Sequence, residues 1–177
     1  MDRAANRPRR PIVGIMGASE PSRESADAAR ELGRLVAERG WIVLTGGRDA
    51  GVMAAACAGA KAVRQSLTLG VLPGDKEDVA PGVDIAVFTG MGDARNFINV
   101  LTADVVVACG VGSAGTASEA SFALVAGKPL ILLGASETAR RFFRDVRARG
   151  RVYEAASASE AAELMEGELG LSRFTWD

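Results

Sequence analysis

Short, continuously apolar runs recur along the chain, each bounded by glycine, proline or polar residues. Runs of this kind, without the alternation of a strand that has one face in water, are typical of a parallel sheet covered on both faces. They predict strands at residues 12–16, 41–44, 67–72, 85–88, 104–108 and 130–133, with a weaker one at 151–153.

Longer segments between these runs have helical character. In the first of them, Ala28, Leu32, Leu35 and Val36 recur at helical spacing and charged residues fill the other face. Helices are predicted at 23–39, 50–64, 94–103, 117–126, 137–149 and 159–168. Strands that alternate with helices imply right-handed crossovers, and therefore an α/β, doubly wound, mainly parallel sheet of six to seven strands with helices on both faces.

The chain has no internal repeat and no linker, so residues 11–177 are predicted to form one ligand-binding domain. The first ten residues form a basic segment that we expect to be a disordered tail; its arginines are Arg3, Arg7, Arg9 and Arg10. A net charge of −1 gives no general attraction to nucleic acid, which makes nucleic-acid binding an unfavoured function.

The absence of histidine excludes several classes of site. Ser-His-Asp and Cys-His catalysis and histidine zinc sites all need that residue, so acid–base chemistry would fall to carboxylates. Cys57 and Cys109 have no metal-ligand spacing and are expected to be free thiols, and no metal site is predicted.

No apolar run is long enough to span a bilayer and no secretory signal is evident, which favours the cytoplasm.

Glycines follow each of the six predicted main strands. In a parallel sheet, the loops that leave the carboxyl ends of the strands meet at one edge, where ligands bind near a switch in strand order. Turn geometry alone explains many single glycines, but doubled glycines also leave backbone amides uncovered for an anionic phosphate. The glycines in these loops are Gly17, Gly46, Gly47, Gly74, Gly90, Gly92, Gly110, Gly112 and Gly134.

The most informative segment is 90–129. Asp93 is expected to cap the helix at 94–103, which places Arg95 in the first turn, where the helix dipole disfavours a cation and a bound anion would remove the conflict. An arginine that reaches solvent or a neighbouring carboxylate is the alternative. Further on, Thr116 and Glu119 match a capping box, which would explain both residues without function.

Capping does not explain the glycines that precede Thr116. Gly110, Gly112 and Gly115 have the spacing of a dinucleotide fingerprint between a strand and a helix, and Glu137 lies where a ribose partner would be expected. An NAD(P)-dependent oxidoreductase is therefore an alternative. The fingerprint follows the fifth strand instead of the first, which argues against it.

The same residues resemble the superfamily of the Lonely Guy cytokinin-activating phosphoribohydrolases and the molybdenum cofactor carrier proteins, over roughly residues 12–133. These proteins share a Gly-Gly loop that leads to a Gly-x-Met helix start, and an arginine ahead of a Pro-Gly-Gly-x-Gly-Thr-x-x-Glu motif. The matching residues are Gly46, Gly47, Gly51, Val52, Met53, Arg95, Gly115, Thr116 and Glu119.

Two departures separate the chain from the hydrolases. Asn96 replaces the lysine that follows their arginine, and residues 109–112, Cys-Gly-Val-Gly, replace their Pro-Gly-Gly with one additional residue. Both changes resemble the cofactor-carrier branch. Members of the superfamily are often labelled lysine decarboxylases, but Lys61, Lys76 and Lys128 are all better interpreted as surface residues than as partners of a pyridoxal cofactor.

The resemblance implies a Rossmann-like fold, a homodimer or homotetramer, and a phosphate-bearing ligand. The favoured hypothesis is a protein that binds a nucleotide or a molybdopterin-type cofactor, foremost as a molybdenum cofactor carrier, and that need not catalyse a reaction. It requires no cofactor of its own and holds molybdenum only through the pterin. The alternative is a nucleoside 5′-monophosphate phosphoribohydrolase in which Arg95 and Glu119 are catalytic. The ligand-binding residues implied are Gly17, Ser19, Gly46, Gly47, Gly51, Met53, Arg95, Asn96, Gly110, Gly112, Ser113, Gly115, Thr116 and Glu119.

Overall fold

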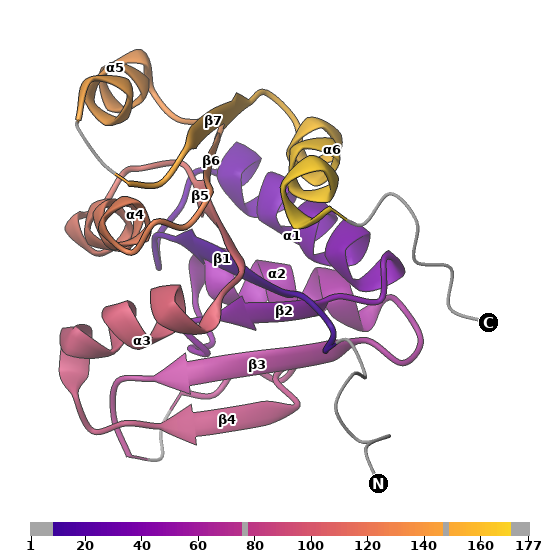
Figure 1. Cartoon of the computed structure of the whole chain (residues 1–177). Helices are drawn as coiled ribbons and strands as arrows, with labels where there is room; N and C mark the ends of the chain where they lie inside the picture. Colours follow the sequence, from indigo (N-terminus) through magenta and orange to yellow (C-terminus); the bar gives the residue numbers. More distant parts are fainter. Residues whose placement is uncertain (1–8, 76–77, 147–148, 171–177) are drawn as a thin grey trace, which may run out of the picture.

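A computed structural model of the chain describes residues 9–75, 78–146 and 149–170. Their seven strands form one sheet in which every neighbouring pair is parallel, in the order β4-β3-β2-β1-β5-β6-β7 (Figure 1). The strands are β1 (Ile12–Gly17), β2 (Ile42–Thr45), β3 (Leu67–Leu72), β4 (Ile85–Phe88), β5 (Val105–Cys109), β6 (Leu130–Leu133) and β7 (Val152–Ala155). The predicted doubly wound α/β fold is confirmed.

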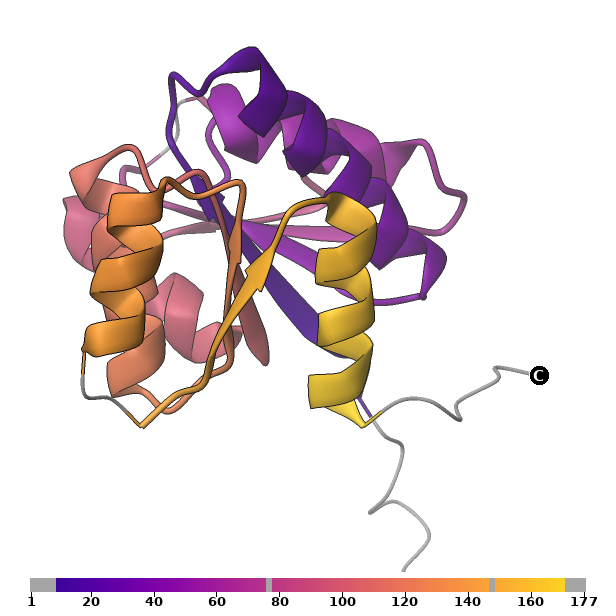
Figure 2. The ribbon, with the colours of Figure 1, turned by 90° about the horizontal axis from the view of Figure 1, so that it is seen from above.

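In the described part of the chain, six α-helices and one 3-10 turn lie between or after the strands. Helices α1, α2 and α6 cover one face of the sheet, and α3, α4 and α5 cover the other (Figures 1 and 2). Side chains alternate between these layers: in β5, Val105 and Val107 face α1 and α6, and Val106 faces α3 and α4. The helical elements are α1 (Arg23–Glu38), α2 (Gly51–Lys61), η1 (Gly92–Ala94), α3 (Arg95–Thr102), α4 (Ala114–Val125), α5 (Glu137–Asp145) and α6 (Ala158–Leu169).

Three predicted helix boundaries are wrong by several residues. Helix α4 begins three residues earlier than expected, because Ser113 is its N-cap. Helix α5 ends at Asp145, since Val146 has extended backbone with ψ 122°. Helix α2 ends at Lys61, and a turn follows it.

Helices α1 and α2 pack closely because each has a glycine at the contact. A Cβ atom on Gly33 would lie 2.1 Å from the carbonyl oxygen of Ala56, and one on Gly59 would lie 1.8 Å from that of Arg30. Real Cβ atoms do not approach backbone oxygens so closely, so only glycine fits at either position. The crossing places the N-terminus of α2 beside the loop after β1, which is part of the site described below.

The strand order reverses between β1 and β5. The chain runs outward from β1 to β4 and then returns to place β5 on the other side of β1. The loops after β1 and β5 therefore leave the same edge in opposite directions, with Gly17 paired to Cys109 at the strand ends. Ligands of open α/β sheets bind in the crevice at such a switch point.

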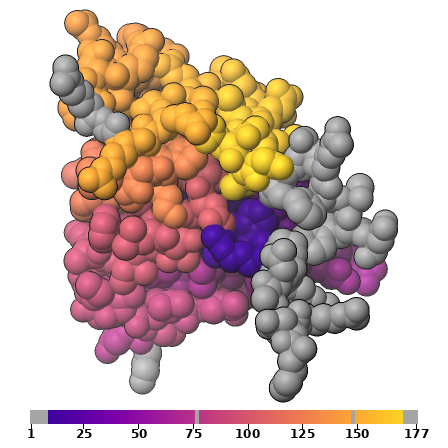
Figure 3. Space-filling model, viewed as in Figure 1, coloured from indigo at the N-terminus to yellow at the C-terminus, as the bar shows by residue number. Residues whose placement is uncertain are grey.

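Two of the four N-terminal arginines contact the folded domain. The guanidinium of Arg9 donates two hydrogen bonds to Asp104, of 2.7 and 2.5 Å, and Arg10 donates to the carbonyl of Gly40. Figure 3 shows the first described residues, in indigo, between the pink segment around residue 100 and the yellow α6. Arg9 and Arg10 therefore differ from the expected tail, whereas Arg3 and Arg7 lie outside the described residues.

In the residues that the structure describes, no helix has both the length and the apolar character needed to cross a lipid bilayer.

Candidate functional site

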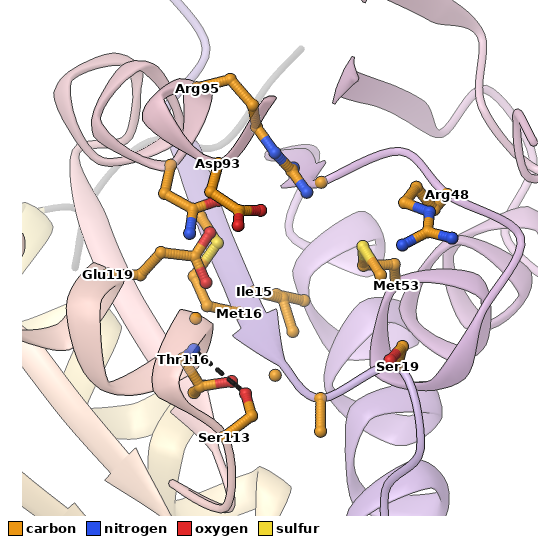
Figure 4. A pocket seen from close by; sticks show the side chains of 15 residues that line it. Ile15, Met16, Ser19, Arg48, Met53, Asp93, Arg95, Ser113, Thr116 and Glu119 are labelled. Carbon is orange, nitrogen blue, oxygen red and sulfur yellow. Dashed lines mark hydrogen bonds between the residues drawn. The ribbon is translucent and has the colours of Figure 1, made fainter. Parts of the chain in front are cut away.

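A cavity of ≈ 130 Å³ opens at the switch point. Its walls come from the end of β1 and the following loop, the loop after β2, the start of α2, η1, the start of α3 and the first turns of α4 (Figure 4). The residues that line it are Ile15, Met16, Gly17, Ala18, Ser19, Gly46, Arg48, Met53, Asp93, Arg95, Asn96, Ser113, Gly115, Thr116 and Glu119.

Arg95 is a buried cation with unused hydrogen-bonding capacity. Only 7% of the residue is exposed; Nη1 donates to the carbonyl of Val71 at 2.8 Å, and Nε, also buried, has no partner in the described chain. Burial lowers the pKa of Arg95, while the nearby charges of Glu119 and Asp93 act in the opposite direction. A buried guanidinium with a free N–H is suited to an anionic ligand.

Gly46 provides the space that this guanidinium occupies. A Cβ atom there would lie 2.2 Å from Nη1 of Arg95 and 2.7 Å from the sulfur of Met53. The backbone of Gly46 has no positive φ, so close approach explains this glycine and a strained turn does not. Gly46, the first glycine of the Gly-Gly sequence, therefore serves the site by leaving room for the Arg95 side chain.

Glu119 is the second buried charged group of the cavity. Its residue is 6% exposed, and its Oε1 accepts a hydrogen bond of 3.0 Å from Nδ2 of Asn99. Burial raises the pKa of Glu119 to about 7, although the Asn99 hydrogen bond and the charge of Arg95 lower it; Asp93 adds to the rise. A carboxyl group with a pKa near neutrality can exchange a proton with a ligand.

The predicted capping roles of Thr116 and Asp93 are wrong. Ser113 caps α4, because its hydroxyl accepts from the amide of Thr116 at 3.2 Å, and Thr116 lies inside the helix. Glu119 therefore belongs to no capping box. Asp93 lies in η1 and makes no capping hydrogen bond to α3, although Arg95 is in the first turn of that helix as expected.

The N-terminus of α4 forms part of the cavity wall, at Ser113, Gly115 and Thr116. The first amides of a helix have no acceptor within the helix, and the helix dipole favours negative charge there. Beside them, the side chain of Asn96 donates to the hydroxyl of Ser118, at 3.3 Å. The cavity therefore joins a helix terminus to a buried guanidinium.

Ten of the fourteen predicted ligand-binding residues line this cavity, and four do not. Gly47 packs against Gly70 and Leu72, and Gly51 packs against the backbone of Ala18 and Ser19. The ten that line it are Gly17, Ser19, Gly46, Met53, Arg95, Asn96, Ser113, Gly115, Thr116 and Glu119.

The other two, Gly110 and Gly112, line a second cavity of ≈ 270 Å³. Ala18 contributes to the walls of both cavities, so the second adjoins the first. Serine hydroxyl groups from the starts of α1 and α5 line this second cavity. Besides Ala18, Gly110 and Gly112, its lining residues are Glu20, Pro21, Ser22, Ser25, Cys109, Val111, Gly134 and Ser136.

Three polar residues of the site were not predicted from the sequence as site residues. Arg48 and the carboxylate of Asp93 line the cavity, and Asn99 holds Glu119 from behind it. A sequence signal existed for Asn99: it lies four residues after Arg95 and three after Asn96, which places all three on one face of an otherwise apolar helix.

The structure also shows the surroundings of the two cysteines and of Glu137, which the sequence had singled out. Both Cys57 and Cys109 are buried free thiols, as expected, and burial raises the pKa of Cys109 to about 12. Glu137 forms ion pairs with Arg140 and Arg144 of its own helix, which accounts for it without a ribose. Among the described residues, no three histidine, cysteine, aspartate or glutamate side chains form a metal-binding group.

Comparison with solved structures finds, among others, two similar proteins that are described as binding or carrying molybdenum cofactor. The molybdenum cofactor binding protein of the phototrophic bacterium Rippkaea orientalis is 42% identical, with a TM-score of 0.86 over 91% of this chain and 98% of that one. The molybdenum cofactor carrier protein of Chlamydomonas reinhardtii is 43% identical, with a TM-score of 0.85 over 92% of this chain and 99% of that one.

Sequence comparison gives the family. An uncharacterised protein of Archaeoglobus fulgidus is 39% identical over 116 residues, which are 66% of this chain and 75% of that protein. The family model of the SLOG cluster4 family matches residues 10–162. Since that match spans most of the sequence, and since the fold agrees with it, this chain belongs to the SLOG cluster4 family.

Proposed function

We propose that this protein binds molybdenum cofactor and carries it, with the phosphate end of the cofactor in the cavity at the switch point. The observation that supports this most is the buried guanidinium of Arg95, whose Nε has no partner among the described residues and which lines the same cavity as the N-terminus of α4. The two similar proteins named above carry or bind that cofactor.

The charges of the cavity suit an anion at one end. Arg48 and Arg95 come from the loop after β2 and from α3, and both line the cavity (Figure 4). An arginine offers paired N–H donors to phosphate oxygens, and the first amides of α4 add donors without charge. A phosphate would therefore interact with Arg95, Arg48 and the amide of Gly115.

The two adjoining cavities together fit an elongated ligand. The first, of ≈ 130 Å³, has room for a phosphate group but not for a whole pterin cofactor. The second, of ≈ 270 Å³, begins at the shared Ala18 and is lined by glycines and serine hydroxyls. In this arrangement the pterin extends toward Gly110 and Gly112, and the molybdenum reaches the protein only as part of the cofactor.

Cofactor loading tests this proposal. Purified protein incubated anaerobically with molybdenum cofactor, then passed through a desalting column, is expected to retain molybdenum and pterin in equal amounts. Arg95→Met should reduce retention at least about tenfold, because a charge-assisted contact is worth roughly 1.5–3 kcal/mol. Arg141→Met, on an arginine whose side chain is 79% exposed on α5, is the matched control. Equal retention by Arg95→Met and the control would contradict the proposed phosphate position.

A second candidate is a nucleoside 5′-monophosphate phosphoribohydrolase. The observation that favours it is a carboxyl group with a pKa of about 7, Glu119, in the same cavity as Arg95. Incubation with a panel of nucleoside 5′-monophosphates, with free base and ribose 5-phosphate followed by mass spectrometry, separates the two functions. Base release that Glu119→Gln abolishes would establish the hydrolase; a folded protein that releases no base supports the carrier.

We also propose that the protein is a homodimer that uses the outer face of α3 and α4. Phe97 and Leu101 of α3 and Val125 of α4 are exposed by 40%, 50% and 64%, and the ring of Phe97 packs edge-on against Phe122. An apolar face of this kind on a monomer marks an interaction site. Light scattering is expected to show a dimer that Leu101→Glu converts to a monomer.

The cytoplasmic location stays a prediction from the sequence, and cell fractionation tests it.

A further inference from the structure

The cavity proposed for an anion also contains two carboxyl groups. Asp93 and Glu119 both point into it, opposite the guanidinium groups of Arg48 and Arg95 (Figure 4). An ionised carboxylate beside a bound phosphate repels it, and burial strengthens that repulsion because solvent screens it less. The site has a way to reduce this repulsion, which lies in the surroundings of Glu119.

Glu119 is buried without a cationic partner in contact. Within the described part of the chain, it makes no ion pair, and its hydrogen bond comes from the neutral amide of Asn99. The charged groups that face it are Arg95 of α3 and Asp93 of η1, which act in opposite directions. Arg48, from the loop after β2, lies farther along the cavity. The carboxyl group of Glu119 can therefore be either protonated or ionised near neutral pH.

Asn99 suits both states of that carboxyl group. It is completely buried; its Nδ2 donates to Glu119, and its Oδ1, also buried, has no partner among the described residues. Asparagine has a donor and an acceptor on one planar group, so a rotation of about 180° would present Oδ1 to a protonated Glu119. The rotation exchanges the hydrogen bond that Nδ2 donates for one that Oδ1 accepts, so Glu119 keeps its Asn99 partner when the carboxyl group gains a proton.

We propose that binding of an anion in this cavity is coupled to the uptake of one proton by Glu119, with Asn99 positioning the carboxyl group in both protonation states. The inference rests on the proposed function, since it requires an anionic ligand. The proton comes from solvent and forms an O–H bond on the Glu119 carboxyl group, and no bond to the ligand is made or broken. The protonated group changes from a repelling charge to a hydrogen-bond donor.

The coupling makes affinity depend on pH in a defined way. Since the pKa of Glu119 is about 7 without ligand, the group is mostly protonated at about pH 6 and mostly ionised at about pH 8. If the bound state requires the proton, affinity falls by about tenfold between those two pH values, by linkage. A bound anion also raises the titration midpoint of Glu119.

Sulfate is the probe, because it is a phosphate-like dianion whose own charge does not change between about pH 6 and about pH 8. Its dissociation constant is measured from amide chemical shifts near Gly115 at both pH values. We expect about tenfold weaker binding by the native protein at the higher pH. Glu119→Gln removes the titration and keeps a donor, so its affinity is expected to change by less than about twofold. Glu163→Gln, on the exposed face of α6, is the matched control and keeps the native dependence.

Asn99 has its own test. Asn99→Leu removes the amide hydrogen bond that lowers the pKa of Glu119. The carbon-13 carboxyl signal of Glu119 is then expected to titrate at higher pH, and the loss of sulfate affinity moves with it. Asn99→Ser, which is smaller and polar, gives the same readout if the leucine variant does not fold. An unchanged carboxyl titration in a folded variant would overturn the positioning role.

The outcomes separate this inference from the proposed function. Sulfate binding that is independent of pH in the native protein, or equally dependent in Glu119→Gln, overturns proton coupling and leaves an anion site in place. No sulfate binding at either pH overturns both the anion site and the coupling. Coupled sulfate binding by a protein that does not retain molybdenum cofactor supports the coupling and rejects that cofactor as the ligand.

Discussion

The two helix layers of this protein bury different kinds of side chain. Helices α1, α2 and α6 pack on the sheet through alanine, valine, leucine, methionine, cysteine and glycine, and their described buried residues include no charged group. Helices α3 and α4 pack on the opposite face and bury polar side chains beside apolar ones; the polar ones are Arg95, Asn96, Asn99, Thr116 and Glu119.

The difference separates stability from binding. Apolar burial in the first layer contributes free energy without requiring partners, whereas buried polar groups in the second cost free energy unless they are hydrogen-bonded. Arg95 and Asn99 each retain a buried atom without a partner in the described chain. The second layer therefore has hydrogen-bonding groups that the fold leaves unpaired and that a ligand could use. The apolar packing of the first layer contributes the stability that offsets the cost of burying these polar groups.

The largest effect is expected from Gly59→Val in the first layer. Its side chain would meet the carbonyl of Arg30, so α1 and α2 must separate, and the free energy of unfolding should fall by about 3 kcal/mol or more. Chemical denaturation measures it. Gly167→Ala, on α6 with no atom within 4 Å of the added Cβ, is the control and should stabilise by about 0.5–1 kcal/mol. A native-like stability for Gly59→Val would show that the first layer is not closely packed.

The next effect concerns the pH dependence of stability in the second layer. The folded-state pKa of Glu119, about 7, is above its ordinary value of 4.5, so the folded protein binds a proton that the unfolded chain lacks between those values. Stability is therefore lost as pH rises through that window. Relative to Glu119→Gln, the native protein should lose on the order of 3 kcal/mol between about pH 4.5 and about pH 8. Parallel stability curves for the two proteins would mean that Glu119 ionises normally.

The smallest effect is expected from Ser113→Ala. The change removes the hydroxyl that accepts from the amide of Thr116, and N-cap losses cost about 1 kcal/mol. It also leaves a further amide free at the cavity, so anion binding should be retained within about threefold while unfolding occurs at lower denaturant. Thr116→Val tests the rejected capping box. If Thr116 were the cap, Thr116→Val would show the loss of stability and Ser113→Ala would not.

Much of the fold could be predicted from the sequence, because continuous apolar runs between glycines leave few alternatives to a covered parallel sheet. The runs at 67–72, 85–88 and 130–133 coincide with β3, β4 and β6. Helix starts were harder. Ser113 and Thr116 are both good capping residues three positions apart, and the choice between them depends on where the loop after β5 turns, which is a tertiary property.

The site was predicted in part, and the misses have physical reasons. Arg95 and Glu119 belong to motifs, so the sequence alone pointed to them. The division of the glycines between two cavities depends on the shape of the loop at Ala18, which sequence spacing does not specify. Asn99 was missed because its partner, Glu119, is twenty residues away and on another helix.

The contact between Gly51 and the loop after β1 has a consequence for how the site opens. The amide of Val52 donates to the carbonyl of Ala18, and a side chain on Gly51 would collide with that same loop. The N-terminus of α2 and one wall of the cavity are therefore fastened together. Solvent exchange at the Val52 amide requires this contact between α2 and the loop after β1 to open, so slow deuterium uptake there reports a preformed binding wall instead of one assembled by the ligand.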